Sequence, residues 1–226
     1  EDLSIKHEQL KKFSNTISHD LQTPINNIIS LISLINEEDV KEETIISEYL
    51  NLVVTSSEQL KEYVNKLLTY YTSDNLIVSK TRFPLADLIS EINQIVNANN
   101  EAEIVTDFDG NLEIITDKTA LSQILINIIS NGIKYNTTDK PIIKITNNIV
   151  NLKSNISISD NGIGIDTQNF EAIFQNNKTL SKKDRYGNYG TGLGLAIVMN
   201  LTQKIDFDIK VSSEIGKGST FTLMEK

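Results

Sequence analysis

Apolar side chains recur every three or four residues through much of the first third of the chain. One run takes in Leu10, Phe13, Ile17, Leu21, Ile25, Ile28 and Ile32, and a second takes in Ile45, Tyr49, Leu52, Ser56, Leu60, Val64, Leu67 and Tyr71. This spacing places each set on one face of a helix, so it predicts two amphipathic helices. Between them, Asn36 to Lys41 is a short polar and acidic connection. The two helices are therefore predicted to be antiparallel neighbours.

A hairpin of two helices buries only one face of each helix, so its remaining apolar surface needs a partner. A four-helix bundle formed by two copies of the chain supplies that partner. We therefore predict a homodimer through the two N-terminal helices. The alternative is a monomeric hairpin that packs on the rest of the chain.

The remainder of the chain mixes the periods of strands and helices. Strand-like segments are Ile77–Phe83, Leu112–Ile115, Ile142–Thr146, Ile156–Ser159 and Ile209–Ser212, with a final strand after the turn at Gly216. Helical spacing covers Pro84–Asn97, Lys118–Tyr135 and Gly194–Gln203. Pro84 suits a first helical turn and Asp117 suits an N-cap. Because strands and helices do not alternate strictly, we predict an α/β sandwich with helices on one face of a mixed sheet.

Glycine is distributed unevenly along the chain. The first 109 residues contain none, and all ten glycines lie between Gly110 and Gly218. Glycine favours turns and loops, so the N-terminal part of the chain is predicted to consist of long regular elements and the C-terminal part to be rich in loops. We place a boundary near residues 73–75. This gives an α+β protein with a helical domain over 1–73 and a second domain over 76–226.

Composition excludes several classes of protein. The net charge of −9 argues against a nucleic-acid partner. The absence of Cys excludes disulfides and cysteine-based metal sites, and it permits a cytoplasmic location. No apolar run approaches the ~20 residues that span a bilayer, so this segment is not expected to contact a membrane. The start inside a helical pattern suggests a fragment of a longer protein, with or without a membrane anchor before Glu1.

The first helical pattern contains Ser18-His19-Asp20-Leu21-Gln22-Thr23-Pro24. The imidazole of His19, with an ordinary pKa near ~6.5, is largely neutral and nucleophilic at neutral pH. Asp20 can accept the other ring N–H and stabilise positive charge on the ring. Thr23 lies four residues further on, nearly on the same helix face, where its hydroxyl could position a water. Pro24 is predicted to bend the helix. A histidine on a helix is nevertheless often only a solvated surface residue.

Two glycine-rich segments suggest a nucleotide pocket. Asp160 closes a predicted strand and opens Asp-Asn-Gly-Ile-Gly, where its carboxylate can accept a hydrogen bond from an amine such as adenine N6. Gly162 and Gly164 would let the backbone approach a flat base. An Asx-capped turn is the alternative interpretation. In the second segment, Gly190, Gly192, Leu193 and Gly194 precede a helix whose free N–H groups could bind phosphates, although no Walker A lysine follows.

Polar residues on one predicted helix complete this pocket. Asn127 and Asn131 lie one turn apart and share a face. The amide oxygen of Asn131 is a suitable ligand for Mg²⁺, and Lys134 beside Tyr135 can neutralise phosphate charge. The alternative is a merely polar helix face.

Two further segments could border the pocket. Residues 170–189 are polar and basic, and we interpret them as a mobile lid whose cations, Lys178 and Lys182 among them, lie near the phosphates. The turn at residues 216–221, with Thr220, would line the far edge.

These motifs in this order resemble the catalytic core of sensor histidine kinases over nearly the whole chain. The segments that match the H, N, G1, G2 and last glycine boxes are residues 18–24, 127–135, 160–164, 190–195 and 216–221. The resemblance implies that His19 accepts phosphate from ATP, with Asp20 as acid/base partner. It implies that Thr23 assists phosphatase activity, that Asn131 ligates Mg²⁺ and that Asp160 reads adenine. The second domain would have the Bergerat fold, and an aspartate of a response regulator receiver domain would receive the phosphoryl group.

One departure from the family pattern lies in the lid. Family members commonly carry a second aromatic residue where this chain has Asn177, with a basic residue close behind; Lys178 or Lys182 would substitute for that cation.

Two alternatives to a histidine kinase are open at this point. An ATPase of the same fold would place a glutamate where this chain has Asn127, so hydrolysis by water should be slow. A scaffold that binds ATP without catalysis is the second alternative, supported by the altered lid.

Overall fold

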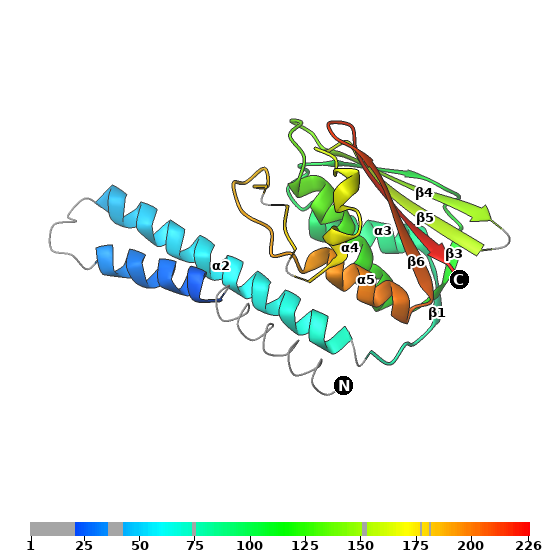
Figure 1. Ribbon diagram of the computed structural model, residues 1–226, viewed down its shortest axis with the longest axis horizontal. Coiled ribbons are helices and arrows are strands. Elements are labelled where there is room, and N and C mark those ends of the chain that lie inside the picture. Colours follow the sequence, from blue (N-terminus) through cyan, green and yellow to red (C-terminus); the bar gives the residue numbers. More distant parts are fainter. Residues whose placement is uncertain (1–20, 36–42, 74–75, 151–152, 177, 181) are drawn as a thin grey trace. The chain divides into compact units, whose positions relative to one another are not determined.

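The computed structural model describes residues 21–35, 43–73, 76–150, 153–176, 178–180 and 182–226. The chain divides into two compact units, residues 1–68 and 69–226. Figure 1 shows the helices and strands of both units.

The first unit contains the predicted helical hairpin. Residues 21–35 are helical, and helix α2 covers Glu43–Ser73. The two helices lie side by side and run in opposite directions (Figure 1). The connection between them, as well as His19 and Asp20, lies outside the described residues. Helix α2 continues beyond the first unit, so its last turn belongs to the second.

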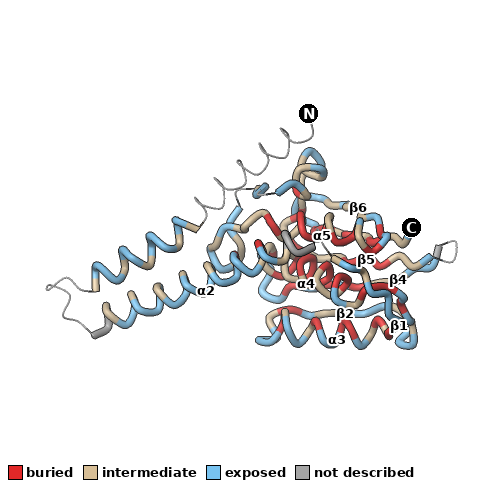
Figure 2. The backbone as a smooth tube through the Cα atoms, turned by 90° about the horizontal axis from the view of Figure 1, so that it is seen from below, coloured by how far each residue is buried: buried red, intermediate tan, exposed pale blue. Residues whose placement is uncertain are grey.

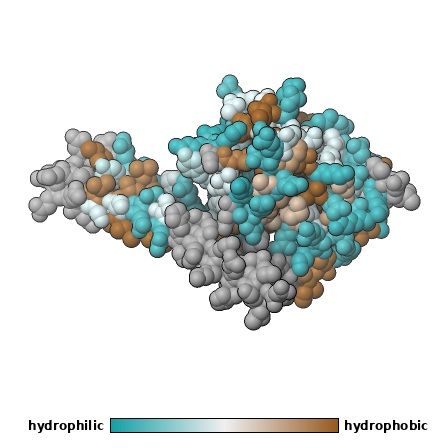
Figure 3. Space-filling view, viewed as in Figure 1, coloured by the Kyte–Doolittle hydropathy of each residue, from teal (hydrophilic) through white to brown (hydrophobic). Residues whose placement is uncertain are grey.

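Many apolar side chains of this helical unit are exposed to solvent. Figure 3 shows hydrophobic side chains gathered on its visible surface. The large exposed ones are Ile25, Ile29, Ile32, Leu34, Leu50, Leu52, Val54, Val64 and Leu68. Tyr63 and Leu67 of α2 are buried, whereas the predicted stripe included Val64 in place of Tyr63. A single copy of this unit therefore leaves much apolar surface uncovered.

The second unit is built on a five-stranded sheet. Its strands are β2 (Glu103–Asp107), β4 (Ile142–Val150), β5 (Lys153–Asp160), β6 (Phe207–Glu214) and β7 (Gly218–Glu225). Their order is β2-β4-β5-β7-β6; β2 is parallel to β4 and every other pair is antiparallel. A separate antiparallel pair joins β1 (Thr81–Pro84) to β3 (Glu113–Thr116). The mixed sheet confirms the sequence prediction.

Three helices cover one face of this sheet: α3 (Leu85–Val96), α4 (Lys118–Lys134) and α5 (Gly194–Lys204). The buried residues in Figure 2 lie mainly along these helices and the strands beneath them. Strand β5 alternates accordingly, since Ile156 and Ile158 are buried while Ser157 and Ser159 are not. Two short 3₁₀ turns, η1 (Thr167–Asn169) and η2 (Ala172–Phe174), follow β5. This packing fixes both α4 and the end of β5.

Local sequence signals predict the helix starts well. The Asp117 side chain accepts a hydrogen bond from the Ala120 N–H at 2.9 Å, which confirms it as the N-cap of α4. Helix α3 begins one residue later than predicted, because Pro84 has an extended ψ of 131° and pairs with Glu113 in the small sheet.

Two strand predictions need correction. The strand predicted over residues 77–83 is confined to Thr81–Pro84 because β3 has only four residues to pair with it. Upstream, the Ser79 N–H donates to the Asp117 carboxylate at 2.9 Å instead. Strand β2 was not predicted: it is a half-exposed edge strand whose parallel partner, β4, is distant in sequence.

Candidate nucleotide site

Asp160 occupies the end of β5, where that strand meets helix α4. Its Oδ1 accepts hydrogen bonds from the Gly162 N–H at 2.8 Å and from the Ser219 N–H at 3.3 Å. Its other oxygen, Oδ2, accepts no hydrogen bond from the described residues. Burial raises the pKa of this carboxyl above the usual aspartate value, although the two backbone donors oppose the shift. One carboxylate oxygen thus stays available to a ligand.

The turn after Asp160 brings its backbone close to the end of helix α4 and to the Glu214 carbonyl. The Ile163 N–H donates to the Tyr135 carbonyl at 3.1 Å, which ties this turn to the end of α4. Gly164 has φ +70°, and a Cβ there would overlap the Glu214 carbonyl. Only glycine fits this position, because both the left-handed backbone and the close approach exclude a side chain.

The asparagines of α4 face the start of α5. Asn127 is 5% exposed and donates to the Gln123 carbonyl at 2.8 Å. A Cβ on Gly194 would lie 3.1 Å from Asn127 Oδ1 and 3.8 Å from Asn131 Nδ2. Leu193, buried at 1% exposure, precedes the first turn of α5 and provides no side-chain cap. The first N–H groups of α5, near the asparagines, therefore form an electropositive helix end.

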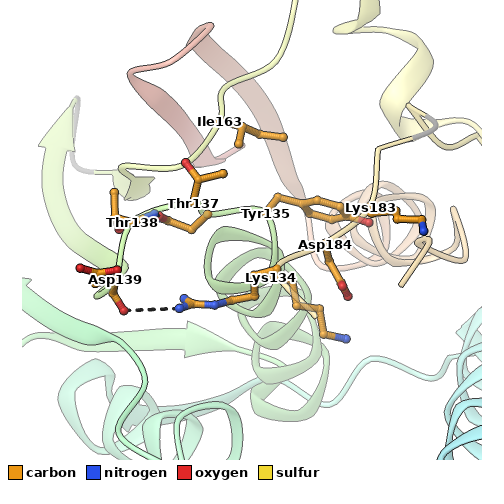
Figure 4. A pocket seen from close by; sticks show the side chains of 10 residues that line it. Lys134, Tyr135, Thr137, Thr138, Asp139, Ile163, Lys183 and Asp184 are labelled. Atoms are coloured by element: carbon orange, nitrogen blue, oxygen red, sulfur yellow. Dashed lines mark hydrogen bonds between the residues drawn. The ribbon is translucent and has the colours of Figure 1, made fainter. Parts of the chain in front are cut away.

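The last residues of α4 line a cavity of about 460 Å³. Lys134 and Tyr135 come from α4 and its C-cap, Ile163 from the turn after Asp160, and Lys183 and Asp184 from the predicted lid (Figure 4). The Tyr135 hydroxyl lies so close to Gly190 that a Cβ there would overlap it. Burial, followed by the Asp184 charge, raises the pKa of Tyr135. Of the predicted nucleotide-binding residues, Lys134 and Tyr135 thus line this cavity, whereas Asp160, the asparagines of α4 and the Gly190–Gly194 segment are not among its lining residues.

Thr220 and Ser219 lie on opposite faces of β7. The Thr220 hydroxyl lies 2.8 Å from the Ser159 hydroxyl, on the sheet face opposite buried Phe221. Ser219 instead donates its N–H to Asp160, and its hydroxyl lies 3.0 Å from that of Ser213. Ser219 is therefore the residue of β7 beside Asp160. Strict alternation along β7, counted from Phe221, would have indicated this.

The predicted lid is anchored at its beginning. Ile173 is buried, and the Phe174 ring packs edge-on against Phe221 with centroids 6.4 Å apart. Lys178 and Lys182 are exposed, and within the described chain their ammonium groups make no ion pair or hydrogen bond. The structure brings neither lysine to the cavity, which Lys183 lines instead. Mobility of this segment stays a prediction.

Of the predicted catalytic residues, only Thr23 is described. It is exposed on the helical segment 21–35. Nowhere in the described ranges do three or more His, Cys, Asp or Glu side chains form a cluster able to hold a metal. Among the described helices, none combines the length and hydrophobicity needed to cross a membrane.

Two protein families match the chain in the order of its two units. The His Kinase A (phospho-acceptor) domain matches residues 9–76, which include His19. The Histidine kinase-, DNA gyrase B-, and HSP90-like ATPase domain matches residues 116–225, which include Asp160 and the asparagines of α4. Together the two matches give the chain the domain order of a sensor histidine kinase catalytic core. The phospho-acceptor domain accounts for the helical hairpin, and the ATPase-type domain accounts for the α/β unit.

Individual relatives agree with this family. The chain is 31% identical over 228 residues to the autoinducer 2 sensor kinase/phosphatase LuxQ of Vibrio parahaemolyticus, covering 93% of this chain and 26% of LuxQ. Among solved structures, the histidine kinase ThkA in complex with the response regulator TrrA matches with a TM-score of 0.74 and 22% identity, over 97% of this chain and 63% of that one. The Acinetobacter baumannii histidine kinase AdeS matches with a TM-score of 0.70 and 23% identity, over 92% and 97% of the two chains. These structures support the fold.

The chain spans less than half the length of the sequence relatives it matches, with coverage between 11% and 49% for LuxQ and three others. The activity of the whole protein is therefore a matter for proposal.

Proposed function

We propose that this chain binds ATP in its second unit and transfers the terminal phosphoryl group to His19, from which it passes to an aspartate of a response regulator receiver domain. The observation that carries this proposal is the convergence of Asp160, the α4 asparagines and the Gly190–Gly194 segment in one place. The family match over residues 9–76 adds the phospho-acceptor segment that holds His19.

Asp160 would orient the nucleotide base. Its Oδ1 is occupied by two backbone donors, so Oδ2 is left to accept the N6 amine of adenine. Gly162 lies against the same carboxylate, because a Cβ there would come within 2.8 Å of Asp160 Oδ1, so the absence of a side chain lets the backbone approach it. Lys134, Lys183 and the first N–H groups of α5 would neutralise the phosphates.

Asn131 would hold Mg²⁺. Its side-chain amide makes no hydrogen bond within the described chain, and it lies beside Gly194 at the electropositive start of α5. A site with one amide ligand and no cluster of carboxylates suits Mg²⁺, which takes its remaining ligands from phosphates and water. When bound, the ion would neutralise charge on the transferred group.

Direct hydrolysis of ATP is disfavoured by the side chain at position 127. A water nucleophile needs a general base beside the γ-phosphate. Asn127 is an amide, is buried, and is hydrogen-bonded to its own helix through Gln123. It cannot accept a proton at neutral pH, so the reaction depends on a nucleophile from elsewhere, which we assign to His19. Asp20 would accept the other ring N–H and stabilise the charge that develops on the imidazole. Thr23 would position water for the reverse, phosphatase reaction.

The exposed apolar side chains of the helical unit support a homodimer. A second copy would cover them in a four-helix bundle. The receiver domain is proposed as the second partner, in line with the response regulator in the ThkA complex. We place the reaction in the cytoplasm.

Incubation with γ-labelled ATP and Mg²⁺ tests this proposal. The purified chain should acquire an acid-labile, alkali-stable label, and His19→Gln should abolish it while ATP binding stays intact. Light scattering on the same samples should give the mass of a dimer. Intact ATP binding without any label in the wild-type chain would favour the non-catalytic scaffold, and release of inorganic phosphate from both proteins would favour the ATPase.

A further inference from the structure

Residues 183–189 of the predicted lid form a small hairpin. Lys183 pairs with Tyr189 in an antiparallel bridge, and the Asp184 N–H donates to the Asn188 carbonyl at 2.8 Å. The Asp184 carboxylate accepts the N–H groups of Tyr186 at 2.9 Å and Asn188 at 2.8 Å. The tip is therefore a defined structure held by its own aspartate.

Arg185 attaches this hairpin to the end of helix α4. Its N–H donates to the carbonyl of Lys134, the last residue of that helix, at 2.9 Å. Its guanidinium donates to the Asp139 carbonyl at 3.4 Å (dashed line in Figure 4). A cation at a helix C-terminus is favoured by the helix dipole. The first attachment therefore joins the lid to the helix that carries Asn131 and Lys134.

Tyr186 makes a second attachment, to a loop far away in sequence. Its hydroxyl donates to the Glu101 carboxylate, which also accepts from the Asn99 amide at 3.2 Å. Each partner perturbs the other. The hydrogen bond from Tyr186 is the main reason that the pKa of Glu101 is lowered. Burial and the Glu101 carboxylate raise the pKa of Tyr186 to about 12.

The loop that presents Glu101 is held to the end of helix α3 by hydrogen bonds. Ala102, the next residue, forms two backbone hydrogen bonds with the buried Asn97 side chain. Its N–H donates to Asn97 Oδ1 and its carbonyl accepts from Asn97 Nδ2, both at 2.9 Å. Asn97 is 8% exposed and is the C-cap of α3. The lid hairpin therefore contacts a loop that is hydrogen-bonded to the C-terminal end of helix α3.

We propose that Tyr186 and Glu101 are positioning residues that latch the lid hairpin and so control how long a nucleotide stays bound. The hairpin leads directly into Gly190, which lies against the Tyr135 hydroxyl, and then into the Gly192–Gly194 segment. Holding the tip at Glu101 therefore restricts the Gly190–Gly194 segment, which borders the proposed nucleotide site. This inference rests on the proposed ATP binding.

The matched test compares Tyr186→Phe with Tyr189→Phe in the full chain. Both residues lie on the hairpin and are exposed, at 51% and 65%, but the Tyr189 hydroxyl makes no hydrogen bond with the described residues. Without nucleotide, trypsin cleavage after Lys183 and Arg185 reports the population of open hairpin. Loss of this hydrogen bond, which is exposed to solvent and therefore weaker than a buried one, should raise this cleavage about fivefold in Tyr186→Phe and leave Tyr189→Phe like wild type.

Further variants separate the latch from the nucleotide function. Glu101→Ala should match Tyr186→Phe, the double variant should go no further, and Glu101→Gln should keep part of the latch through its remaining acceptor oxygen. Release of a fluorescent ATP analogue should accelerate by a similar factor.

Equal cleavage of Tyr186→Phe and wild type would overturn the latch. A faster cleavage with unchanged analogue release would overturn its role in retention. A chain that binds no analogue, yet opens faster in Tyr186→Phe, would overturn ATP binding and leave the latch standing.

Discussion

The substitution Asp160→Asn separates recognition of a base from support of the fold. The Asn side chain retains an oxygen that can accept the N–H groups of Gly162 and Ser219, as Asp160 Oδ1 does. The group that takes the place of Oδ2 is then an NH₂ donor facing the ligand. Adenine N6 is also a donor, so the proposed contact is replaced by two opposed donors.

The magnitude follows from this single contact. A hydrogen bond to a charged group contributes about 1.5–3 kcal/mol. At about 1.4 kcal/mol for each factor of ten, ATP affinity should fall about 10- to 100-fold. Inosine triphosphate carries a carbonyl oxygen where ATP carries the amine, so it should bind the variant better than ATP does. Dimer formation should be unchanged.

Stability should respond in the opposite direction to binding. Because burial raises the Asp160 pKa, the folded chain keeps this proton to a higher pH than the unfolded chain does. Ionisation therefore costs stability as pH rises from the unfolded-state pKa through the higher folded-state pKa. Asn does not ionise, so the variant should be at least as stable as wild type at neutral pH.

Titration calorimetry with ATP and inosine triphosphate, together with urea unfolding, measures all of these effects. Asp166→Asn is the matched control, because Asp166 accepts a backbone N–H two residues ahead, from Gln168 at 2.9 Å, just as Asp160 accepts that of Gly162. It should change neither affinity nor nucleotide preference. ATP binding that stays normal in Asp160→Asn would refute the assignment of Asp160 to adenine.

Three further outcomes are expected. Gly164→Ala should lower the free energy of unfolding by about 2 kcal/mol or more, whereas Gly187→Ala, with φ +84° but open space around it, should cost only about 1 kcal/mol in urea melts; equal losses would refute the clash with Glu214. Ser219→Ala and Thr220→Val should both leave ATP affinity nearly unchanged, because Asp160 accepts the backbone N–H of Ser219 and the Thr220 hydroxyl lies against that of Ser159; calorimetry showing a large loss of affinity in Thr220→Val would return Thr220 to the site. Thr23→Ala should autophosphorylate normally but fail to dephosphorylate the receiver domain; unchanged phosphatase rates in a labelled-receiver assay would remove Thr23 from the mechanism.

Sequence signals that act within a few residues predicted much of the secondary structure. Helix α4 begins where Asp117 predicts it, because an N-cap bonds to an amide only three residues away. The helical period predicted α4 and α5 to within one or two residues. The glycine and asparagine motifs predicted a set of candidate site residues, and the structure brings Asn131 close to Gly194 and the neighbouring Gly132 close to Asp160.

Periodicity and capping residues therefore predicted most of the helices and strands and their order. Tertiary structure decided which residue of β7 lies next to Asp160, because the position of β7 along β5 depends on the pairing of the two strands. It also decided that β2 exists, since its parallel partner is distant along the chain. Finally, tertiary structure brought Tyr186 into contact with Glu101, which is 85 residues away in the sequence. No local pattern encodes this contact, because it forms only when the two loops fold next to each other.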